Sequence, residues 1–181
     1  MSFSPDRKYI ATGHGSAIIR VWDIAKKHVR NVFRHRGGVS GVDFSPDGRF
    51  VVSAAHDCTV CAWSIRDGSG RIYSYSDSPY YSLRLTPDGR YVTVTDYSGE
   101  LTRIHYRTGQ EVRWRCHGYP ATIAHMPNGT GLVTGSLDKT LKYWDPSFLG
   151  EFQEDTSEFT ESLSFIGHTV RFTNYLYSIL D

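Results

Sequence analysis

Four side chains between residues 35 and 63 are of the types that cooperate in nucleophilic chemistry. They are His35, Ser53, Asp57 and Trp63. A histidine held by an aspartate can take the proton of a serine hydroxyl, which is the arrangement that serine hydrolases use. Such triads are defined by geometry and by the role of each residue, so the residue types alone leave a hydrolase as one hypothesis for this chain.

The same types occur a second time, with matching intervals between the hydroxyl, the carboxylate and the indole. The histidine of this copy is one position out of step. The second set consists of His117, Thr134, Asp138 and Trp144, with threonine in place of serine. Because a catalytic set seldom occurs twice in one small domain, the duplication favours a structural role for both sets. We therefore expect no catalytic residue and no enzymatic activity.

Three cysteines, Cys58, Cys61 and Cys116, offer little for metal binding. The first two form a lone C-x-x-C, whereas a zinc site needs more ligands at fitting spacing, and residues three apart on a strand point to opposite faces. The first residues lack the apolar stretch of a signal peptide, so free thiols in a reducing compartment are expected. These observations predict no metal, no cofactor and a nuclear or cytoplasmic location.

The overall charge excludes a general attraction to nucleic acid, since the formal net charge is +1. No apolar run is long enough to span a bilayer, so no membrane partner is expected. Locally, however, one stretch is basic and contains no acid: Lys26, Lys27, Arg30, Arg34 and Arg36. Basic side chains often line a solvated sheet edge, and this is the favoured interpretation. The alternative is a patch that binds an acidic partner or the phosphates of a nucleic acid. A second basic group consists of Arg107, Arg113 and Arg115.

A turn-forming motif recurs about every forty residues along the chain. Proline fixes φ and Asp or Asn bonds the local backbone, so each copy predicts a turn. A large apolar residue follows each proline after 17 positions, and short apolar stretches between the two predict β-strands. The prolines are Pro5, Pro46, Pro87 and Pro127, and the apolar residues are Trp22, Trp63, Ile104 and Trp144.

This period, with Asp after the first and last tryptophan, resembles the WD-repeat family of β-propellers. The resemblance implies an all-β partial propeller of about four blades, each a four-stranded antiparallel sheet packed on its neighbours. It also implies that the His, Asp, Ser or Thr, and Trp of a repeat form one hydrogen-bonded chain. The third repeat should lack this chain and be the least stable blade, because it carries Ser76, Val94, Ser98 and Ile104 at these positions.

The same template divides residues 1–168 into blades of approximately 1–34, 35–75, 76–115 and 116–167. An acidic insertion is expected at 146–160, and residues 169–181 form a divergent tail. Four blades of a sevenfold propeller leave unpaired faces at both ends, which favour association. Three explanations stay open: a fragment of a longer gene product, a half-propeller that pairs with a partner or with itself, and a ring closed by a strand at 170–177.

Within the WD-repeat family, residues 18–33 and 131–145, followed by "SFIGH" at 164–168, resemble the propeller of the fungal Groucho-like (Tup-type) general transcriptional corepressor. The resemblance implies a non-enzymatic scaffold in the nucleus. DNA-bound repressors or corepressor subunits would be its partners, bound as peptide segments on the narrower face of the propeller. A WD-repeat adaptor of another complex is the alternative.

Overall fold

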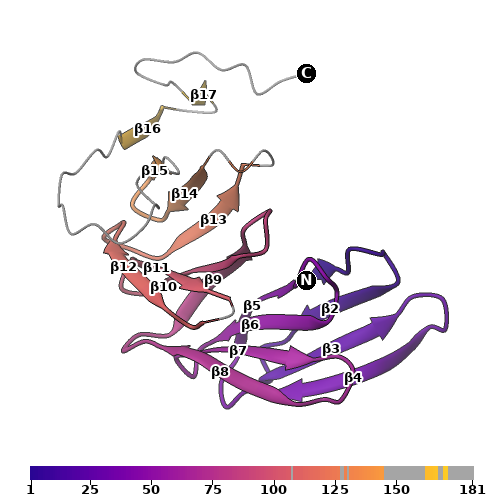
Figure 1. Ribbon diagram of the computed structural model, residues 1–181. Coiled ribbons are helices and arrows are strands. Elements are labelled where there is room, and N and C mark those ends of the chain that lie inside the picture. The colour runs from indigo at the N-terminus through magenta and orange to yellow at the C-terminus, as the bar shows by residue number, and fades with distance from the viewer. Residues whose placement is uncertain (107, 127–128, 130, 145–161, 167–168, 171–181) are drawn as a thin grey trace.

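The structure, a computed structural model, describes residues 1–106, 108–126, 129, 131–144, 162–166 and 169–170. The regular elements in this part of the chain are all β-strands. They form four antiparallel sheets that pack one after another in a fan-shaped arrangement (Figure 1). The predicted all-β fold class of about four propeller blades is confirmed. No helix that could cross a bilayer occurs among these residues.

Consecutive strands are hydrogen-bonded neighbours within each sheet. Sheet 1 contains β1 (Ser2–Phe3), β2 (Tyr9–Gly13), β3 (Ile18–Asp23) and β4 (His28–Arg34). Sheet 2 contains β5 (Val39–Phe44), β6 (Phe50–Ala55), β7 (Thr59–Ser64) and β8 (Gly70–Tyr75). Sheet 3 contains β9 (Tyr80–Leu85), β10 (Tyr91–Asp96), β11 (Glu100–His105) and β12 (Glu111–Arg115). Sheet 4 contains β13 (Ala121–His125), β14 (Leu132–Ser136), β15 (Thr140–Trp144), β16 (Ser162–Ile166) and β17 (Thr169–Val170).

The repeated proline motif forms the turn between the first two strands of a sheet. In sheet 2, Ser45 Oγ donates to Asp47 Oδ1 at 2.6 Å and accepts the Phe50 N–H at 3.0 Å. The same carboxylate accepts the Arg49 N–H at 3.0 Å, which closes the turn. Ser4 and Thr86 make the matching bonds in sheets 1 and 3. The hydroxyl and carboxylate thus fix the register of each hairpin.

Apolar side chains fill the space between neighbouring sheets, so the core formed by the described residues is divided into three layers. The layer between sheets 1 and 2 includes Ile19, Val21, Val42, Phe44 and Val51. The layer between sheets 2 and 3 includes Val52, Val60, Leu83, Val94 and Ile104. The layer between sheets 3 and 4 is smaller and contains Leu101, Cys116, Ile123, Leu132 and Trp144. Alternation along each strand directs successive side chains into successive layers.

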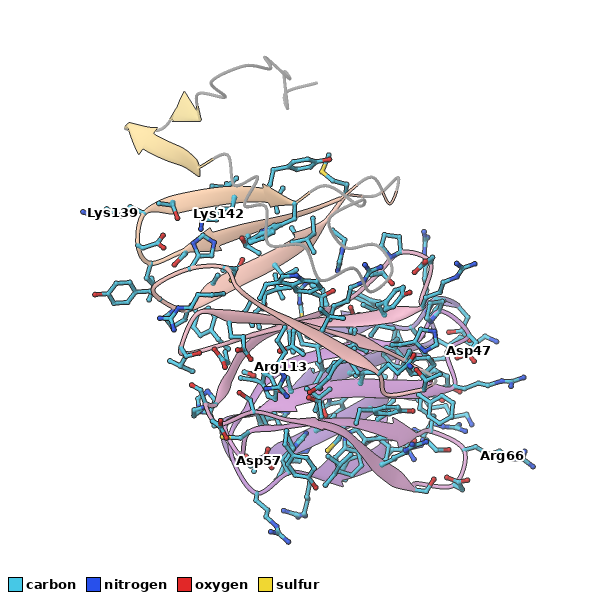
Figure 2. The ribbon with its side chains drawn as sticks, turned by 60° about the vertical axis from the view of Figure 1, so that its left-hand side comes forward. Asp47, Asp57, Arg66, Arg113, Lys139 and Lys142 are labelled. Atoms are coloured by element: carbon cyan, nitrogen blue, oxygen red, sulfur yellow. The ribbon has the colours of Figure 1, made fainter. Side chains whose placement is uncertain are left out.

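The antiparallel order sorts the connections between strands to two opposite ends of the sheets. Figure 2 shows Asp57 and Lys139, from the β6–β7 and β14–β15 turns, at one end, and Asp47 and Arg66 at the other. We call the first the loop end. It also carries the β8–β9, β10–β11 and β12–β13 connections, because strand direction alternates.

Sheet 4 also includes β16, in which Ser164 pairs with Thr140 of β15. The sheet continues into β17, where Val170 pairs with Phe165. Within the expected tail, therefore, the first two residues belong to this sheet. The predicted acidic insertion at 146–160 and most of the predicted closing strand at 170–177 lie outside the described residues.

Candidate functional site

The first set of candidate residues converges at the loop end of sheet 2. His35, in the β4–β5 loop, has its Nδ1 atom 3.0 Å from Asp57 Oδ2 and its Nε2 atom 2.7 Å from Ser53 Oγ. Trp63 Nε1 donates to the same hydroxyl at 2.7 Å. The four side chains form one continuous chain that ties the loop to β6, β7 and the turn between them.

The second set makes the corresponding contacts in sheet 4. His117 Nδ1 lies 3.0 Å from Asp138 Oδ2, and its Nε2 lies 2.8 Å from Thr134 Oγ1. Trp144 Nε1 donates to that hydroxyl at 2.9 Å. Serine and threonine therefore serve the same purpose, since only the hydroxyl takes part.

The Ser53 hydroxyl is not placed to attack a substrate, although its contacts resemble those of a triad. The residue is completely buried, and its oxygen already accepts the indole N–H of Trp63. A nucleophile must reach a substrate atom, and none can approach this one. What the chain of hydrogen bonds can do is satisfy buried polar groups and hold the loop rigidly on the blade.

Burial and hydrogen bonding set the charge states of these groups. Burial lowers the pKa of His35 below its ordinary value of 6.5 despite the nearby Asp57 carboxylate, and His117 behaves in the same way beside Asp138. Burial alone would raise the pKa of the Asp138 carboxyl, but hydrogen bonds from Thr140 and His117 bring it to about 2. Neutral histidine donating to a carboxylate is thus the state that the fold favours at neutral pH.

A further histidine, His125, was not among the residues that the sequence pattern indicated. His125, at the end of β13, occupies the position at which the other sheets have Phe3, Phe44 and Leu85. Burial, aided by the positive charge of Arg103, lowers its pKa to about 4. Its Nε2 atom is buried without a hydrogen bond to any described residue. A comparison of equivalent positions in the repeats could have found it.

We expect the free energy of unfolding to fall as the pH drops from 6.5 towards 4. The folded-state pKa values of His35, His117 and His125 are depressed, so protonation favours the unfolded chain and stability is complete only above pH 6.5. His125 alone contributes up to about 3 kcal/mol to this loss. Urea unfolding across this pH range measures it. His125→Leu should flatten the profile, and His28→Asn, at an exposed position of β4, should leave it unchanged. An equally steep profile in His125→Leu would contradict the assignment.

The two remaining repeats use different residues at the loop end. In sheet 3, Val94 and Ile104 replace the hydroxyl and the indole, but Ser76 donates to Asp96 Oδ2 at 2.9 Å. The four-residue chain is therefore missing from this repeat, as the sequence predicts. The Ser76–Asp96 link is a separate contact that was not predicted, because Asp96 lies two residues before Ser98, outside the aligned positions. In sheet 1, His14 Nε2 lies 3.0 Å from Thr12 Oγ1.

The cysteines lie apart from any ligand cluster. Cys58 is in the β6–β7 turn, whereas Cys61 and Cys116 are buried, and all three are free thiols. Burial raises the pKa of Cys61 to about 11 and that of Cys116 to about 12, so neither is a thiolate at neutral pH. Among the described residues no group of three or more His, Cys, Asp or Glu could hold a metal ion.

The basic run extends along the outer strand of sheet 1 instead of gathering into a pocket. Lys26 and Lys27 lie in the β3–β4 turn, Arg34 ends β4, and Arg36 follows in the next loop. Arg30 is held against Tyr9, whose hydroxyl accepts its Nη1–H at 3.3 Å. All five side chains belong to exposed residues. Of the second group, Arg113 is paired with Glu111 and Glu100.

Three exposed apolar residues lie at the loop end of sheets 3 and 4. Tyr97, Tyr119 and Leu137 are 45%, 60% and 69% exposed and lie in the β10–β11, β12–β13 and β14–β15 connections. The Tyr97 ring makes edge contacts with the rings of His56 and Tyr81, with ring centroids 5.5 Å and 5.3 Å apart. We call Tyr97, Tyr119 and Leu137 the loop-end patch.

An open recess of about 390 Å³ lies beside the loop-end patch. It is lined by the end of β12, the loop after it, and β15. Arg115 and Lys142 contribute positive charge, and Asp138 contributes one carboxylate. Lys142 Nζ donates to the Cys116 carbonyl at 2.5 Å. The recess could accept a polar or acidic side chain next to an apolar one.

Comparison with known proteins gives the family. The family model for "WD domain, G-beta repeat" matches residues 1–23, 26–64 and 110–145, which together are more than half of the chain. The unmatched stretch between 65 and 109 includes most of sheet 3, where Val94 and Ile104 replace the polar chain. No curated protein matches the sequence. The chain belongs to the WD-repeat family, whose members are typically non-enzymatic scaffolds for protein interactions.

Proposed function

We propose that this chain is a non-enzymatic scaffold that binds an extended segment of a partner protein at the loop end. The main observation that supports this proposal is the loop-end patch. Its three apolar side chains come from successive connections of two neighbouring sheets, and each is exposed although large. Aromatic anchors of this kind supply most of the energy at protein interfaces, because they bury much area at a small entropic cost.

The recess beside the patch indicates which charge the bound segment carries. Arg115 and Lys142 line it with Asp138, so its lining carries two positive groups and one negative group when His117 is neutral. A peptide carboxylate placed there would meet fixed donors and gain a charge-assisted hydrogen bond. We therefore expect ligands that combine apolar residues with an acidic one.

A displayed peptide library selected on the purified chain tests this proposal. Double replacement Tyr97→Ala and Tyr119→Ala should weaken the selected peptides about thirtyfold, since loss of two anchors costs about 2 kcal/mol. The matched control is Val32→Ala with Ile72→Ala, which removes two exposed apolar side chains from the outer strands β4 and β8. Equal losses in both double variants, or no enriched peptide, would contradict the proposal.

The resemblance to Tup-type corepressors supports a finer proposal. Residues 18–33 and 131–145 carry that resemblance, which makes transcription factors or corepressor subunits the partners and the nucleus the location. Segments of DNA-bound repressors would then be the natural ligands of the loop-end patch. An adaptor role in another complex predicts the same patch with different peptides, so the sequences recovered by selection separate the two.

A further inference from the structure

The junction between neighbouring sheets is built the same way each time. Each sheet presents a front face to the sheet before it and a back face to the sheet after it. In the first junction, the back-face residues Ala11, Ile19 and Val21 share a core cluster with the front-face residues Phe44 and Val51. The next junction repeats this pattern 41 residues later, with Val52, Val60 and Ala62 against Leu85 and Val92.

Sheet 1 has the same front face, but no described sheet covers it. Phe3, Trp22 and Ile24 are 56%, 36% and 40% exposed. Their equivalents 41 residues later include Phe44 and Ile65, which are 5% and 7% exposed. The front face of sheet 1 therefore has apolar residues at the positions that are buried between sheets 1 and 2. Figure 1 shows sheet 1 at one end of the fan.

Sheet 4, at the opposite end of the fan, has a back face that no described sheet covers. Val133 and Leu141 correspond to Val52 and Val60 but are only partly buried, and Tyr143 is 38% exposed. Gly135 corresponds to Gly13. A Cβ atom at Gly13 would lie 2.5 Å from Val39 of the next sheet, whereas one at Gly135 would have no atom within 4 Å.

We propose that the front face of sheet 1 binds the back face of sheet 4 in a second copy of this chain. Between sheets 1 and 2, and again between sheets 2 and 3, a back face packs on a front face. The front face of sheet 1 and the back face of sheet 4 are the same two kinds of surface, so a second copy offers a complementary face at each end of the chain's fan. Two copies joined head to tail at both ends form a closed ring of eight sheets, within the usual range for propellers. The loop-end patch stays accessible in this ring.

Analytical ultracentrifugation of the full chain tests the proposal. We expect a species of twice the 20.5 kDa chain mass that dissociates on dilution. Ile24→Asp on the front face and Tyr143→Asp on the back face should each give monomers, because a charge would be buried in both junctions of the ring. Ile72→Asp, at a 45% exposed site on the outer strand β8, is the matched control and should remain dimeric.

Mixing the two monomeric variants distinguishes a head-to-tail junction from any other dimer. The intact back face of Ile24→Asp can meet the intact front face of Tyr143→Asp, so the mixture should regain a dimer held by one junction. A monomer at every concentration would overturn the proposal. So would dimers unaffected by either variant, a mixture that stays monomeric, a ladder of larger species, or association only with a different protein.

Discussion

Replacing Gly99 by alanine is expected to lower the free energy of unfolding by about 4 kcal/mol, a large part of the stability of an ordinary domain. Gly99 lies in the β10–β11 turn at a φ of +83°, where L side chains are strained. An added Cβ would lie 2.2 Å from the His117 carbonyl oxygen, a backbone atom that cannot rotate away. Urea or thermal unfolding measures the loss.

The reason for this size is that Gly99 holds the start of the β12–β13 connection, which leads from sheet 3 to sheet 4. Its carbonyl accepts the N–H groups of Cys116 at 3.0 Å and His117 at 3.1 Å. Gly118→Ala is the matched control, since a Cβ there meets nothing within 4 Å and the change should stay within about 0.5 kcal/mol. Similar small effects from both variants would show that the backbone of the β12–β13 connection is not held rigidly against Gly99.

Replacing Ser53 by alanine is expected to cost about 2–4 kcal/mol of unfolding free energy. The substitution leaves the Trp63 indole N–H and the His35 Nε2 atom buried without their partner, and each unpaired buried group costs about 1–3 kcal/mol. Denaturant unfolding, followed by tryptophan fluorescence, measures the effect.

Ser53→Thr is the control for this experiment, because Thr134 holds the same position in sheet 4 and makes the same bonds. We expect this variant to retain most of the stability. A Ser53→Ala chain with unchanged stability but with loss of an ester hydrolysis shown by the parent would reverse the interpretation, making the set catalytic and not structural.

Much of the fold could be predicted because the repeat encodes it locally. Each proline turn is closed by bonds among its own neighbouring residues, such as Ser45 to Asp47, and so depends little on distant packing. Residues 35, 53, 57 and 63 could be grouped because a second repeat carries the same residue types, with equal intervals for the last three and the histidine shifted by one position. The repeat period thus made it possible to group residues that are distant in the sequence without knowledge of the three-dimensional structure.

The parts that the sequence did not reveal depend on contacts between sheets or on local shifts. Asp96 links to Ser76 from two residues before the aligned position, so comparison by register passed over it. The edge contact of Tyr97 with His56 joins sheets 2 and 3 and has no local signal. The basic run was visible as charge, but its extension along the edge strand β4 follows only from the fold.

Hydrogen–deuterium exchange of the chain with and without a selected peptide tests the central claim most directly. The account predicts slower exchange of backbone amides at residues 97–99, 116–119 and 137–139, where the loop-end patch and its recess lie. The proline turns at the opposite end should be unaffected. Protection confined to those turns, or to β4 with its basic run, would contradict a scaffold that receives its partner at the loop end.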